Sequence, residues 1–85
     1  MATVIKPEGS TYELGDPTSL KVLQGAVEGY LEPVRLSDGR LMYVNEDGRL
    51  NRLPPNPAAS LLARQDIVGS VVVLTLEETQ AAEEG

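Results

Sequence analysis

The residues best suited to chemistry in this chain are arginines, asparagines and one tyrosine around a single polar run. The run is YVNEDGRLNRLPPNPAAS, residues 43–60, and it separates two apolar segments. A guanidinium makes two-pronged contacts with phosphate or carboxylate groups, and amide and phenol groups orient such ligands. These residue types predict a modest binding site for a small anion or a partner. Its candidate residues are Arg35, Tyr43, Asn45, Glu46, Arg49, Asn51 and Arg52.

The distribution of basic residues sets limits on that site. Five of the seven bases are arginines between Arg35 and Arg64, where only three acidic residues accompany them. The same distribution is expected where arginine is simply the ordinary surface base. An anion site and a plain surface role for these arginines therefore both stay open. A nucleic-acid interface is normally more basic and is interleaved with aromatic side chains. The net charge is -6 and three Tyr are the only aromatic residues, so we predict no direct nucleic-acid binding.

The composition removes most catalytic and metal-binding chemistry. The chain has no His and no Cys, and so lacks the usual general base near neutral pH and the commonest zinc ligands. The pair Glu46–Asp47 lies in a predicted turn that faces solvent, which does not suit paired-carboxylate catalysis. Tyr43 stands where a calcium loop of the EF-hand type requires an acid, and the glycines lack phosphate-loop spacing. We therefore expect no enzyme, no cofactor and no metal.

Turn signals and apolar spacing define the elements that must position the candidate residues. Residues 3–14 predict a β-hairpin, and the β-branched residues 66–76 predict a central strand buried on both faces. Asp16 with Pro17 and Asn56 with Pro57 predict the starts of two helices. The predicted fold class is α+β. It is a small, mainly antiparallel sheet of about five strands in β-β-α-β-β-α-β order, with two short helices.

A second hairpin is predicted within residues 29–48, where Asp38–Gly39 indicates a two-residue turn. This turn pairs Leu36 with Leu41, and it gives the strands two distinct faces. One face carries Glu32, Val34, Leu36, Leu41, Tyr43 and Asn45, and the other carries Leu31, Pro33, Arg35, Met42 and Val44. Pro33 predicts an edge strand or a bulge. On the first face, which we expect to be turned to the core, Asn45 needs a polar partner, and the backbone of the neighbouring loop is the expected one.

The domain is expected to span residues 1–76 and to end in a disordered acidic tail over residues 77–85. The tail holds Glu77, Glu78, Glu83 and Glu84 and no base. A homodimer is expected because Leu31, Met42 and Val44 need cover on a chain of 85 residues. No secretory or membrane-spanning pattern occurs, so we expect a cytoplasmic protein without a membrane partner.

Three segments carry a longer pattern: MATVIKPEG, VEGYLEPVRLSDGRLMYVNEDGRLNRLPPNPAAS and DIVGSVVVL. They resemble the family called domain of unknown function 3846, over about residues 2–74. The shared positions are Tyr30, Glu32, Asp38, Gly39, Asn45, Glu46, Gly48, Leu53, Pro54, Asn56, Ala59 and Gly69. The chain departs from the pattern at Glu28, where members often carry paired glycines. The resemblance implies a protein of phages, plasmids or their hosts, and transfers no functional residue because no shared activity is established.

This context favours a protein that acts by binding. The first hypothesis is a non-enzymatic phage or mobile-element accessory protein that occludes a host protein, as an inhibitor or counter-defence factor in the host cytoplasm. The acidic balance, the edge strand and the two-sided apolar hairpin suit it. The alternative is a protein that sequesters a nucleotide-like anion, with Asn45, Asn56 and Tyr43 orienting the ligand beside the arginines. The second alternative is a structural or regulatory role.

Overall fold

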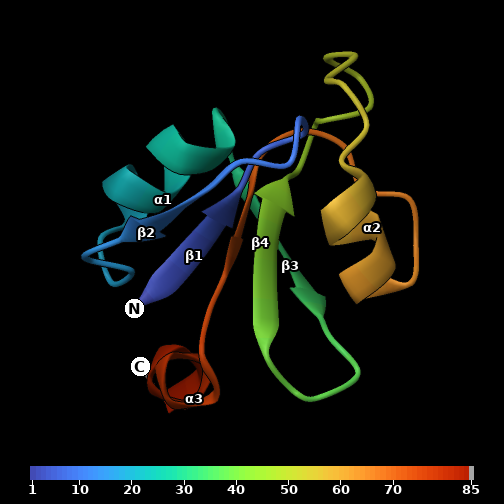
Figure 1. Cartoon of the computed structure of the whole chain (residues 1–85). Coiled ribbons are helices and arrows are strands. Elements are labelled where there is room, and N and C mark those ends of the chain that lie inside the picture. Colours follow the sequence, from blue (N-terminus) through green and yellow to red (C-terminus); the bar gives the residue numbers. More distant parts are fainter. Residues whose placement is uncertain (85) are drawn as a thin grey trace.

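A computed structural model describes residues 1–84 as one five-stranded sheet with three helices. The elements in chain order are β1 (Ala2–Ile5), β2 (Thr11–Leu14), α1 (Leu20–Val27), β3 (Leu31–Arg35), β4 (Leu41–Asn45), α2 (Pro57–Ala63), β5 (Val71–Val73) and α3 (Leu76–Glu84). The strand order across the sheet is β2-β1-β5-β4-β3, with antiparallel neighbours throughout (Figure 1). The predicted α+β class is confirmed. The element order differs from the prediction by a third helix, α3, which follows β5.

The sheet separates two hydrophobic clusters. The cluster on the α2 side contains Ile5, Leu36, Met42, Val44, Ala59, Ile67, Val71 and Val73. The cluster on the α1 side contains Ala2, Val4, Leu23, Val27, Leu41, Val72 and Leu74. Because side chains alternate along a strand, Val71 and Val73 face α2 while Val72 faces α1. The central strand β5 is therefore buried on both faces, as the β-branched run predicts, although it is shorter than the predicted strand.

The hairpin of β3 and β4 differs from its prediction by one residue of register. Leu36 N donates to Arg40 O at 2.9 Å and Gly39 N donates to Leu36 O at 3.0 Å. Gly39 has a φ of +96°, so the loop is the three-residue type with a glycine in the left-handed region. Arg35 consequently pairs with Leu41 and Val34 with Met42. A shift of one residue moves every side chain of one strand to the opposite face.

This register corrects the predicted faces. Met42 and Val44 share the α2 side with Glu32, Val34 and Leu36, while Leu41, Tyr43 and Asn45 share the α1 side with Leu31, Pro33 and Arg35. Met42 and Val44 are buried within the single chain, and Leu31 packs against the α1-side cluster. The expectation of a homodimer therefore loses the side chains on which it was based. The position of β3 at the sheet edge agrees with the expectation from Pro33.

Residues 76–84 form helix α3, whereas the sequence predicted a disordered tail over residues 77–85, of which Gly85 lies outside the described residues. Thr75 N donates to Glu78 Oε1 at 2.9 Å, and Glu78 N donates to Thr75 Oγ1 at 3.1 Å. This reciprocal pair is a capping box, and its signature is the TLEE sequence at residues 75–78. The N-terminal amino group lies 3.6 Å from Glu78 Oε2, so the start of the chain lies beside α3 (Figure 1).

Helix α1 begins later than predicted and ends on an unusual residue. Its N-cap is Ser19, whose Oγ accepts from Val22 N at 3.3 Å, while Asp16 accepts from Thr18 N at 3.1 Å in the preceding turn. Glu28 closes the helix with a φ of 63°, in the left-handed region that favours glycine. The departure from the family pattern at Glu28 thus falls on a strained helix end.

No helix among residues 1–84 is long and apolar enough to cross a membrane.

Candidate functional site

Asn45, the first polar residue of the run, has a structural role. Its side chain is buried, Nδ2 donates to Val27 O at 3.0 Å, and Oδ1 accepts from Asp47 N at 2.8 Å. A Cβ on Gly29 would lie 2.5 Å from that Nδ2, so the backbone approaches the amide closely. The predicted bonding to neighbouring backbone is confirmed. Glu32, expected on the same face, lies on the opposite one.

Asn56 joins three segments of the fold. It is fully buried, and its Oδ1 accepts from Ala59 N at 3.1 Å, which confirms the predicted N-cap of α2. Its Nδ2 donates to Ile5 O at 3.0 Å and to Gly69 O at 2.9 Å. Both amide hydrogens are therefore used by the fold, which leaves Asn56 no donor for a ligand.

A polar hollow of about 510 Å³ lies between the turn after β4 and the loop after α2. Three of the candidate residues line it, namely Glu46, Arg49 and Asn45, although the Asn45 amide is bonded to Val27 O on the α1 side. Arg49 Nη2 donates to Asp66 O at 3.2 Å. The charged residues that line the hollow are Glu32, Glu46, Asp47, Arg49 and Asp66. Four carboxylates beside one guanidinium do not favour an anionic ligand.

The other four candidate residues lie outside this hollow. Asn51 and Arg52 are exposed in the turns that follow β4, where Asn51 N donates to Asp47 O at 2.8 Å. Arg35 and Tyr43 point to the opposite face of the sheet, because the register places them with Leu41. The structure therefore divides the seven candidates between two faces and does not gather them into one site.

The opposite face carries a hollow of about 390 Å³ between α1 and α3. A further hollow of about 410 Å³ shares Tyr43 and Ala82 with it and extends toward Pro33 in the edge strand. We call the two together the apolar trough. Its principal lining residues are Leu20, Leu23, Leu31, Tyr43, Ala81 and Ala82. Leu20 is 59% exposed although it is a large apolar side chain, so the trough is open to solvent.

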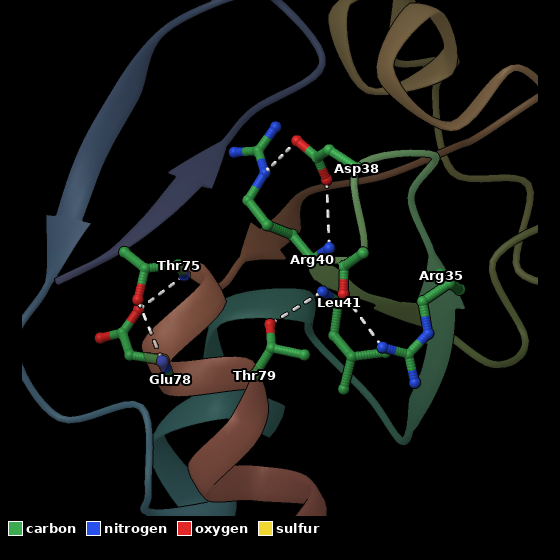
Figure 2. A network of polar contacts seen from close by, with 8 residues as sticks. Arg35, Asp38, Arg40, Leu41, Thr75, Glu78 and Thr79 are labelled. Atoms are coloured by element: carbon green, nitrogen blue, oxygen red, sulfur yellow. Dashed lines mark hydrogen bonds and ion pairs between the residues drawn. The ribbon is translucent and has the colours of Figure 1, made fainter.

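Helix α3 forms one wall of the trough. Figure 2 shows the polar side chains at its start, Thr75, Glu78 and Thr79, beside β4. Thr79 is buried, and its Oγ1 accepts from Leu41 N at 3.0 Å. Arg35 Nη1 donates to Glu83 Oε1 and to Gly39 O, both at 3.0 Å. The hydrogen bond with Glu83 raises the pKa of Arg35, and Arg35 lowers the pKa of the Glu83 carboxyl. Arg35 is thus occupied in fixing α3, and the sequence interpretation missed Thr79 because it missed the helix.

The carboxyl groups with clearly shifted pKa values all shift in one direction. A hydrogen bond from the Ser10 side chain lowers the pKa of Glu8, and one from the Thr18 side chain lowers that of Asp16. The backbone hydrogen bond from Arg40 lowers the pKa of Asp38. A carboxyl that acts as a general acid near neutral pH needs a raised pKa. These groups are suited to charge interactions and not to proton donation.

Fold and site together define a small α+β protein with helices on both faces of an antiparallel sheet and an apolar trough beside an acidic helix. The chain matches the family described as Domain of unknown function (DUF3846) over residues 1–83, and it belongs to that family. No curated protein and no solved structure matches the chain. The family resemblance of the three sequence segments is therefore confirmed, and the match extends into α3.

Proposed function

We propose that this protein acts without catalysis, by binding another protein through the apolar trough and covering part of its surface. The observation that carries the proposal is the open trough itself, with Leu20 59% exposed and Tyr43 only half-buried at its floor. Burial of such side chains against a partner is the main favourable term in protein association. In the setting that the family resemblance implies, the partner is a host protein and its occlusion is the inhibitory or counter-defence step.

The composition supports a binding role over a catalytic one. The chain has no His and no Cys, and the clearly shifted carboxyl pKa values are lowered. The sequestration of a nucleotide-like anion has weaker support, because acidic side chains dominate the polar hollow and Arg35 is paired with Glu83. The predicted homodimer is a separate proposal, and the mass measured by light scattering tests it.

Affinity capture with three forms of the protein tests the proposal. Leu20→Ser removes an exposed apolar side chain from the trough, and Leu61→Ser removes one that is 82% exposed on α2. We expect a host protein to be retained by the wild type and by Leu61→Ser but lost with Leu20→Ser. Circular dichroism checks that all three are folded. Equal retention by all three forms would contradict binding through the trough.

A thermal-shift screen against nucleotides tests the competing function. A ligand that binds only the folded state raises the unfolding midpoint. We expect no rise with mono-, di- or triphosphates. A saturable rise, together with no Leu20-dependent protein in the capture experiment, would replace occlusion by sequestration.

A further inference from the structure

The charges around the apolar trough point to the chemistry of its occupant. Helix α3 carries Glu77, Glu78, Glu83 and Glu84 and no base. Glu78 and Glu83 line the two hollows of the trough directly. Of these two, Glu83 is already paired with Arg35 of β3, and Glu78 lies 3.6 Å from the N-terminal amino group. Lys21 is the one base in α1. The trough is therefore an apolar surface beside a strongly acidic wall.

We infer that the trough binds an amphipathic helix with lysine or arginine beside its apolar side chains, an inference that rests on the proposed function. Apolar side chains of such a helix, spaced three and four residues apart, would contact Leu20, Leu31 and Tyr43. Its basic side chains would lie against the carboxylates of α3. Complementary charge of this kind speeds association and excludes acidic partners.

The edge strand explains why the occupant is a helix and not an added β-strand. Glu46 N donates to Tyr30 O, and Leu36 N donates to Arg40 O, both at 2.9 Å. Hydrogen-bonding positions alternate along an antiparallel strand, so Leu31, Pro33 and Arg35 direct their backbone groups to the open edge. Proline has no N–H, so Pro33 interrupts the edge at its centre. The accessible surface beside β3 is the face of the sheet within the trough.

A second copy of this chain is a poor occupant of the same surface. Its net charge is -6, and its own helix α3 would bring four more carboxylates toward this wall. Like charges brought together at an interface oppose association. The acidic wall likewise opposes an anionic lipid surface. A basic segment of another protein is the occupant that both the apolar and the charged features fit.

Nuclear magnetic resonance mapping with a designed peptide tests this inference on the full chain. The probe is an amphipathic helical peptide of leucine and lysine. One matched peptide replaces lysine by glutamate, and another replaces leucine by serine. We expect the leucine–lysine peptide to shift the amide signals of Leu20, Tyr43 and Ala82. We expect Leu20→Ser to weaken its binding roughly fivefold to tenfold and Leu61→Ser to leave it unchanged, because one apolar contact is lost only in the former.

The polar hollow is a built-in control, because it is acidic but lies on the opposite face of the sheet. Shifts centred on Gly48 and Val68, or equal binding of the serine–lysine peptide, would show simple charge attraction and overturn the inference. Stronger binding of the leucine–glutamate peptide would overturn the charge argument alone. Failure of every peptide, with Leu20-dependent capture of a host protein intact, would reject the basic helix and leave the proposed function standing.

Discussion

Helices α2 and α3 are attached to the same sheet in different ways. The start of α2 is fixed by the fully buried Asn56, which bonds the helix and two other segments. Ser60 joins α2 to the segment that follows the helix. Its Oγ accepts from Ile67 N at 2.9 Å and donates to Asn56 O at 2.8 Å. Within residues 1–84, helix α3 has one buried polar anchor, Thr79, and two surface ion pairs, Glu83 with Arg35 and Glu78 with the N-terminal amino group.

The contrast separates the part of the molecule that maintains the fold from the part that faces a partner. Buried polar groups must be fully bonded, so the loss of one partner leaves the others unsatisfied. Exposed ion pairs contribute little and are screened by salt. We therefore expect α2 to open only with global unfolding. We expect α3, which forms a wall of the trough, to open at lower free energy.

The largest effect is expected for Asn56→Ala. It removes the cap of α2 and leaves the buried carbonyls of Ile5 and Gly69 without their donor. We expect a loss of about 3 kcal/mol in the free energy of unfolding, which lowers Tm by roughly 15 °C for a domain of this size. Urea unfolding measures it. Asn51→Ala, at an exposed position in the same polar run, is the control and should change little.

Thr79→Val tests the other half of the comparison. The substitution keeps the shape of the side chain but removes the acceptor of the Leu41 N–H. We expect a loss of about 2 kcal/mol, because a buried donor is left unpaired. Hydrogen exchange should accelerate at Leu41 and along α3 while β5 stays protected. Uniform acceleration across the sheet would show that α3 opens only with the whole fold, and would remove the distinction between the helices.

Helix α1 ends, as α2 does at Arg64, on a residue in the left-handed region of backbone conformation. Glu28 holds a φ of 63°, which costs a residue with a side chain about 1 kcal/mol relative to glycine. Glu28→Gly is therefore expected to stabilise the protein by about 1 kcal/mol and raise Tm by roughly 5 °C. Glu28→Ala is the matched control, since it removes the charge and keeps the Cβ. An equal gain from alanine would assign the effect to charge and not to the backbone.

The sequence predicted the fold class well because its signals are local. Asn56 followed by Pro57 marks a helix start, and the valines of β5 mark a buried strand, so both were predictable without tertiary information. The hairpin register was wrong because Asp38–Gly39 suits both a two-residue and a three-residue loop, and one residue exchanges the faces of the strand. That exchange hid the trough, since it separated Tyr43 from Leu31.

The candidate site was less predictable than the fold. Residue type suggested that Arg35 binds a ligand. Only the position of α3 shows that the Arg35 guanidinium is already paired with the Glu83 carboxylate. The acidic composition of residues 77–85 suggested disorder and concealed the capping box of Thr75 and Glu78. Thr79 becomes an anchor only because α3 places it against Leu41, a contact between residues far apart in the sequence.

The smallest expected effect concerns the pH dependence of α3. Arg35 lowers the pKa of Glu83 below its ordinary 4.5 in the folded state. A carboxyl with a lowered folded pKa stabilises the fold above its unfolded pKa and loses that contribution as pH falls through the folded pKa. Hydrogen exchange of α3 should therefore accelerate, relative to β5, as the pH drops below about 4.5. Added salt screens the ion pair, so it should reduce the difference in α3 protection between neutral and acidic pH. Glu83→Gln should remove this pH dependence, whereas Glu84→Gln should keep it.

If Glu83→Gln and the wild type lose α3 protection in parallel, the ion pair does not hold the helix. Thr79 is then the anchor that distinguishes α3 from α2.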